Sequence, residues 1–248
     1  MTKRHATLRM LLAVVIALSA CAGGSTVKKV EPNALWQQAM DGLAAGKWTE
    51  ATRLFERFTL EFPTDSRYQE ARYHLSEARF GAKEYITAAT EFARLSSDFP
   101  AGPFADDAQF KVCESYQRLS PDIELDQEYT QGAVDHCQVL LSYFPASEFV
   151  PRATAILAEM TDKLAHKLYW TGDYYFRRKA YDPAIMYYEL VAKTYPISAY
   201  APRALNRMVD AYKILGYDTE EAATRARLLK DYPESVTPKP KPDSVGRR

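Results

Sequence analysis

The residue types that carry out acid–base or metal chemistry are scattered along this chain. Of its four histidines, His5 stands near the N-terminus, and His74, His136 and His166 are separated by long intervals. The chain contains no His-Glu-x-x-His and no Cys-x-x-Cys spacing, which are the patterns that place zinc ligands together. It also lacks a glycine-rich phosphate loop and a Gly-x-Ser-x-Gly nucleophile turn. We therefore expect no catalytic residue, no metal and no cofactor.

Two pairs of residues have a structural interpretation beside a chemical one. Asp106 and Asp107 could suggest paired carboxylates, but they follow a Pro-Phe-Ala turn, where acids place negative charge near a helix N-terminus. Cys113 and Cys137 fall on the two helices of one hairpin in the repeat pattern described below. An oxidising compartment would allow a disulfide between them, whereas two buried free thiols are the alternative. The sequence leaves both open.

The remaining cysteine, Cys21, has the surroundings of a lipid attachment site. Residues 1–10 carry three basic side chains and no acid, and residues 11–18 form an apolar run that is too short to span a bilayer. This order is typical of a secretory signal peptide. Its end resembles the bacterial lipobox, in which the cysteine thiol is alkylated by a diacylglyceryl donor and becomes the new N-terminus. The alternative is a simple secretory signal with a cysteine there by chance.

The composition and charge of the chain exclude several classes of protein. A content of 47% hydrophobic and 26% charged residues excludes wholesale disorder and a polytopic membrane protein. Without residues 1–20, the chain carries three more acids than bases, so it lacks the basic excess that drives nucleic-acid binding.

We predict a lipoprotein signal peptide at 1–20, a lipidated cysteine and flexible tether at 21–31, a folded region at 32–235, and a disordered, proline-rich basic tail at 236–248.

An aromatic residue followed by proline recurs through the folded region. The prolines are 37, 45, 51 and 37 residues apart, and apolar residues between them recur every three or four positions, as in helices. Proline ends each second helix because it has no N–H to donate. Internal repeats of this length predict an all-α, right-handed solenoid of about five tetratricopeptide-like helix hairpins. The pairs are Phe62-Pro63, Phe99-Pro100, Phe144-Pro145, Tyr195-Pro196 and Tyr232-Pro233.

The order of small and large residues within each unit resembles that of the tetratricopeptide repeat. Small residues such as Ala184 let two helices approach, and large ones such as Tyr188 fill the space beside them. Gly46 and Gly216 predict tight turns between the helices of the first and fifth units. The third unit fits only if an insertion around residues 120–129 is skipped.

The inward-facing positions of the first helices carry large apolar side chains. As a set, they predict a groove for an extended peptide that bears an aromatic residue. The alternative is that individual rings only pack between neighbouring helices. The candidate groove residues are Trp36, Met40, Tyr73, Phe80 and Phe110.

A lipobox followed by five repeats of uneven length resembles the BamD family of outer-membrane β-barrel assembly lipoproteins. Residues 99–116, 125–130 and 164–189 carry the likeness. The resemblance implies a non-enzymatic adaptor, lipid-anchored on the periplasmic face of the outer membrane. Its partners would be the periplasmic domains of the barrel-forming assembly protein, other assembly lipoproteins and unfolded outer-membrane precursors.

The resemblance also implies roles for individual residues. The N-terminal repeats would capture the precursor's C-terminal signal, which ends in an aromatic residue, and the C-terminal repeats would contact the barrel-forming partner through Arg203, Arg207 and Lys213. Two other classes stay open. A pilotin-type lipoprotein would show tighter repeat spacing, and a Tol-Pal-type envelope factor would carry a coiled coil and no lipobox.

Overall fold

The computed structural model describes residues 31–236, and every element in that range is a helix. Cys21, the predicted signal peptide and nearly all of the predicted tether and tail lie outside the described residues. The helices are α2 (Pro32–Ala44), α3 (Trp48–Glu61), α4 (Tyr68–Gly81), α5 (Tyr85–Asp98), α6 (Ala105–Leu119), α7 (Glu128–Tyr143), α8 (Val150–Arg177), α9 (Tyr181–Thr194), α10 (Ala201–Leu215), α11 (Asp218–Asp231) and α12 (Pro233–Val236).

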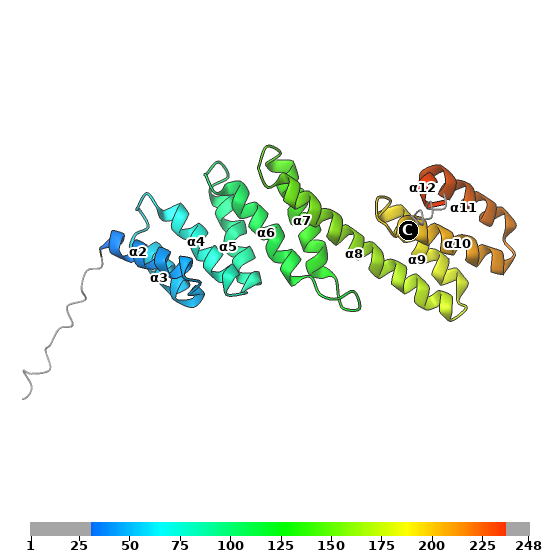
Figure 1. Cartoon of the computed structure of the whole chain (residues 1–248), viewed down its shortest axis with the longest axis horizontal. Coiled ribbons are helices and arrows are strands. Elements are labelled where there is room, and N and C mark those ends of the chain that lie inside the picture. Colours follow the sequence, from blue (N-terminus) through cyan, green and yellow to red (C-terminus); the bar gives the residue numbers. More distant parts are fainter. Residues whose placement is uncertain (1–30, 237–248) are drawn as a thin grey trace, which may run out of the picture.

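Consecutive helices pack as five antiparallel hairpins, from α2 with α3 to α10 with α11. Each hairpin also packs on the next, so the chain forms an elongated array with α2 at one end and α11 at the other (Figure 1). The second helix of each hairpin ends immediately before the aromatic residue that precedes a recurring proline. These helices are α3, α5, α7, α9 and α11. The predicted all-helical solenoid of five hairpins is confirmed.

Left-handed backbone closes four of the hairpins. Gly46 and Gly216 have φ angles of 67° and 73°, as their predicted place in tight turns requires. Lys83 and Lys179 occupy the corresponding turns of the second and fourth hairpins with φ angles of 65° and 62°. A side chain makes this conformation costly, so these two turns are held by the helices that they join.

The third hairpin has a longer connection, residues 120–127, where the sequence predicts an insertion. Two lysines of α8 hold it. Lys163 Nζ donates to Ser120 Oγ at 2.7 Å, and Lys167 Nζ donates to the carbonyl oxygen of Glu124 at 2.9 Å. The inserted segment is therefore docked on the next hairpin.

The long interval between the third and fourth prolines is a single 28-residue helix, α8. Its N-terminal half packs into the core of the third hairpin through Ile156 and Met160. Its C-terminal half packs against α9 and α10 through Ala165 and Leu168. One helix thus joins the two halves of the array (Figure 1).

Cys113 of α6 and Cys137 of α7 form a disulfide, with Cα atoms 5.0 Å apart. Of the two possibilities that the sequence leaves open, the structure shows the bonded one. Both cysteines are fully buried within the core of the third hairpin. No helix within residues 31–236 combines the length and apolar character that crossing a bilayer requires.

Candidate functional site

A cleft of about 340 Å³ opens where the first helices of the first three hairpins, α2, α4 and α6, come together. Two of the predicted groove residues, Met40 and Phe80, lie in its wall. The cleft is mostly apolar, with one acid and one base among its lining residues. These are Met40, Leu43, Ala44, Trp48, Glu77, Phe80, Gly81 and Lys111.

Trp48 belongs to this cleft although it is the first residue of a second helix, α3. Its ring lies over Gly81, where a Cβ atom would come within 2.5 Å of the indole. The missing side chain at Gly81 thus makes room for the ring, which stays 38% exposed and faces solvent. Trp48 is not among the residues predicted to line a groove, and Gly81 on the next hairpin is the sequence signal that points to it.

The base beside the cleft is part of a cationic cluster. Lys111 Nζ lies 5.0 Å from the centre of the Phe80 ring and 2.9 Å from Glu114 Oε2. Arg118 and Arg152 approach the other oxygen of the same carboxylate, at 3.9 and 3.7 Å. Three cations therefore surround one buried acid beside the cleft, whose wall also carries the acid Glu77. The spacing of these cations in the sequence does not predict the cluster.

Two of the other predicted groove residues, Tyr73 and Phe110, pack inside the solenoid. Phe110 is fully buried and stacks on Phe149, with ring centres 4.8 Å apart. Tyr73 is 5% exposed and stacks on Phe104 at 5.0 Å. The expectation that Tyr73 and Phe110 face an open groove is wrong, because each ring fills the space between one hairpin and the next.

Trp36 is intermediate between these cases. It is half-buried, and its ring centre lies 5.3 Å from that of Phe58. The Arg67 guanidinium covers it at 5.2 Å. Trp36 does not line the cleft that contains Met40 and Phe80, so the structure places it beside this site rather than in it.

Asp106 and Asp107 lie in the first turn of α6, as the helix-start interpretation predicts. Asp107 accepts a 2.7 Å hydrogen bond from the Tyr73 hydroxyl, and Asp106 accepts one of the same length from Ser147. Burial raises the pKa of the Asp107 carboxyl, while the hydrogen bond from Tyr73 acts in the opposite direction. Burial also raises the pKa of Tyr73, which keeps its hydroxyl protonated as a donor. These acids join neighbouring hairpins.

The histidines of residues 31–236 each have a local partner. A ring nitrogen of His74 lies 2.7 Å from Glu77 Oε2, and His166 stacks on Tyr200 at 4.4 Å. Burial lowers the pKa of His136. Within this range, no group of three or more His, Cys, Asp or Glu side chains is placed to hold a metal ion.

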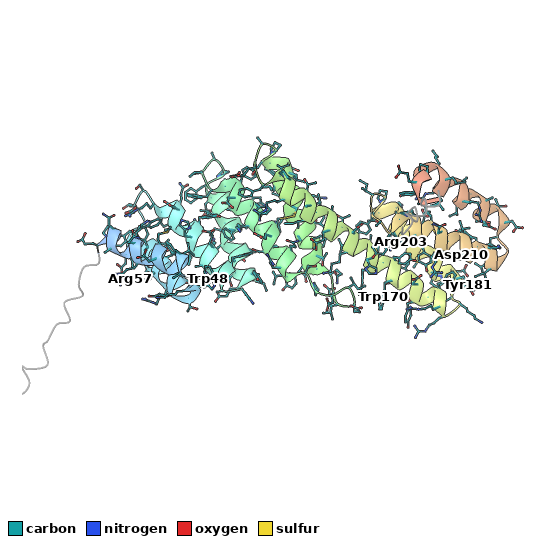
Figure 2. The ribbon with its side chains drawn as sticks, in the orientation of Figure 1. Trp48, Arg57, Trp170, Tyr181, Arg203 and Asp210 are labelled. Carbon is teal, nitrogen blue, oxygen red and sulfur yellow. A yellow bond between two sulfur atoms is a disulfide. The ribbon has the colours of Figure 1, made fainter. Side chains whose placement is uncertain are left out.

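The three cations predicted to contact a partner lie on α10, at the opposite end of the array from Trp48 (Figure 2). Arg203 is exposed, with its guanidinium 5.1 Å from the centre of the Tyr200 ring. Lys213 is exposed and, among the described residues, makes no ion pair. Arg207 forms an ion pair within the chain, because its Nε lies 3.3 Å from Asp173. Arg203 and Lys213 are therefore the more available of the three.

Comparison with known proteins gives a consistent set of relatives. Residues 28–235 match the family model YfiO, described as an outer membrane lipoprotein. Proteins named outer membrane protein assembly factor BamD are similar at low identity. The chain is 27% identical to that of Neisseria meningitidis serogroup B, covering 89% of each chain, and 25% identical to that of Rickettsia prowazekii, covering 92% of this chain and 93% of the relative.

A further BamD, from Caulobacter vibrioides, is 25% identical over 80% of this chain, which spans 65% of the length of that relative. Among solved structures, the TPR2AB domain of yeast Sti1 in complex with pHSP90 is 14% identical with a TM-score of 0.42, covering 82% of this chain and 78% of that one. The YfiO match spans nearly the whole solenoid. The chain belongs to the YfiO family of outer membrane lipoproteins.

Proposed function

We propose that this chain is a non-enzymatic adaptor in the assembly of outer-membrane proteins. Membership of an outer membrane lipoprotein family, and relatives named as outer membrane protein assembly factors, support that role. The proposed anchor is the lipidated Cys21, which would hold the solenoid at the periplasmic face of the outer membrane. Several acyl chains give stable attachment, since each buried methylene contributes about 0.8 kcal/mol.

The cleft between α2, α4 and α6 is the proposed receiving site for unfolded precursors. The observation that carries this proposal is an apolar wall of Met40, Trp48 and Phe80 beside the Lys111 cluster. A volume of about 340 Å³ lies at the lower end of the range for ligand pockets and suits one large side chain. A precursor segment that ends in an aromatic residue would place its ring on the apolar wall and its terminal carboxylate near Lys111.

The exposed cations of α10 are the proposed contact for the barrel-forming assembly protein. Arg203 and Lys213 lie on the hairpin farthest from the cleft, so the chain could bind a precursor and this partner at the same time. Other assembly lipoproteins are proposed as further partners.

Binding of a fluorescent peptide with the C-terminal sequence of an outer-membrane protein tests the cleft. With the full mature protein, Phe80→Ala is expected to weaken binding by about tenfold, because a half-buried ring contributes about 1–2 kcal/mol of contact. The matched control is Ile86→Ala, which removes an exposed apolar side chain of α5 that does not line the cleft. Equal affinity of the Phe80 variant and the control would remove the cleft from the proposal.

A further inference from the structure

A second cleft, of about 440 Å³, lies where the third and fourth hairpins meet. It lies along the long helix α8, which packs against α7 through its N-terminal half and against α9 through its C-terminal half. The connection between α9 and α10 forms the far rim. The lining residues are Gln138, Thr154, Leu157, Ala158, Glu159, Thr161, Asp162, Ile197 and Ser198.

The rim carries an isoleucine that the fold does not use. Ile197 is 97% exposed and follows the proline of the fourth aromatic–proline pair. At the same place after the first three prolines stand Thr64, Ala101 and Ala146, so the turn itself does not need a large apolar residue. Together with Leu157 across the cleft, Ile197 offers apolar surface to a bound segment.

The charge of this cleft is negative. Glu159 and Asp162 line it, and no Lys or Arg is among the lining residues. Each acid uses one oxygen inside the protein: Glu159 accepts from the Gln117 side chain at 2.8 Å and Asp162 from the Ala199 amide at 2.9 Å. Within residues 31–236 neither carboxylate forms an ion pair, so the second oxygen of each can accept from a cation. The cleft therefore suits a basic segment with a small amount of apolar surface.

Such a segment belongs to the chain itself. Residues 237–248 (TPKPKPDSVGRR) carry four bases, a single acid and three prolines. They follow α12, and the residue before that helix, Tyr232, donates a 2.7 Å hydrogen bond from its hydroxyl to the carbonyl oxygen of Pro196. Pro196 is adjacent to Ile197. Through the Tyr232 side chain, the described chain thus contacts the residue next to Ile197 at the rim of the cleft.

Reach and effective concentration are both sufficient. Twelve residues at the polyproline spacing of about 3.1 Å per residue span roughly 37 Å. Tethering also raises the local concentration of the segment to roughly the millimolar range, so a contact too weak to hold a free peptide is occupied within one chain. We propose that residues 237–248 dock in the cleft between α7, α8 and the α9–α10 connection, with Lys239 and Lys241 facing Glu159 and Asp162.

Photo-crosslinking of the purified full mature protein tests this docking. A benzophenone amino acid replaces Ile197 and, in a matched control, Leu60, which is 81% exposed on the first hairpin. We expect Ile197 to crosslink to residues 237–248 within one chain, with a yield that does not change on dilution, and Leu60 not to do so. A crosslink that disappears on dilution, or one that joins Ile197 only to another protein, would overturn the proposal.

Charge reversal in the tail gives a second readout without touching the folded region. Lys239→Glu with Lys241→Glu is expected to lower the Ile197 crosslink by about threefold to tenfold, the loss expected for two exposed ion pairs. Lys239→Arg with Lys241→Arg keeps the charge and should keep the yield. An equal yield from the reversed and the conservative variants would contradict recognition of the tail by Glu159 and Asp162.

Discussion

Removing the disulfide should destabilise the third hairpin more than any other part of the solenoid. Cys113 and Cys137 are separated by 24 residues, and that stretch includes the connection 120–127. The other four hairpins close through tight turns, whereas this one must also order a longer connection. The covalent link offsets that cost by restricting the unfolded chain.

The size of the effect follows from the separation. In the chain-entropy treatment, closing a loop of 24 residues stabilises the folded state by about 3.5 kcal/mol at 25 °C. With a urea dependence of about 2 kcal/mol per molar, the unfolding midpoint of the affected segment should fall by about 1.7 M. Because stability in a solenoid is a sum of local and nearest-neighbour contributions, hydrogen exchange should quicken most in α6 and α7.

Urea unfolding of the mature protein with and without dithiothreitol measures this effect, because reduction keeps both sulfur atoms in the core. The Cys113→Ala, Cys137→Ala double variant is the control and should not respond to the reductant. If reduction leaves the midpoint of the unaltered protein where it was, the stabilising role of the link is refuted. Uniformly faster exchange in all five hairpins would contradict its local action.

Three further results are expected. Hydrogen bonds from Arg67 lower the pKa of Asp65 from 3.8 to about 2. The stabilisation that they give is therefore complete above pH 3.8 and is lost as the pH falls through about 2. The difference in unfolding free energy between the unaltered protein and Asp65→Asn should shrink over that interval, and a constant difference would contradict this assignment. Lys167→Ala should speed limited proteolysis within residues 120–127, since it frees the carbonyl of Glu124, and an unchanged cleavage rate would argue against docking of the connection on α8. Arg203→Glu should weaken co-purification with the barrel-forming partner by about fivefold or more without lowering thermal stability, because its guanidinium is exposed; undiminished recovery would exclude this contact.

The hairpins could be predicted from sequence because their signals are local. An aromatic residue and a proline end each second helix, and Gly46 and Gly216 mark turns that need left-handed backbone. The length of α8 could not be obtained in this way. Between Pro151 and Gly172 nothing interrupts the helical pattern. Counting one repeat length back from Pro196 therefore places a repeat boundary inside what is a single continuous helix.

The candidate site could be predicted only in part. Met40 and Phe80, which the helix pattern assigns to an inward-facing groove, line a cleft. The same pattern places Tyr73 and Phe110 on that surface too, but their burial depends on how closely the next hairpin approaches, which is a tertiary property. Trp48 reaches the cleft from a second helix through space left by Gly81, a contact between hairpins that no single repeat contains.

The most direct test of the proposed adaptor role is purification of the tagged protein from membranes in mild detergent, with its partners identified by mass spectrometry. We expect a stoichiometric outer-membrane barrel protein with periplasmic domains, recovered together with other lipoproteins. Recovery of a secretin, of Tol-Pal components or of no partner would contradict a role in outer-membrane protein assembly.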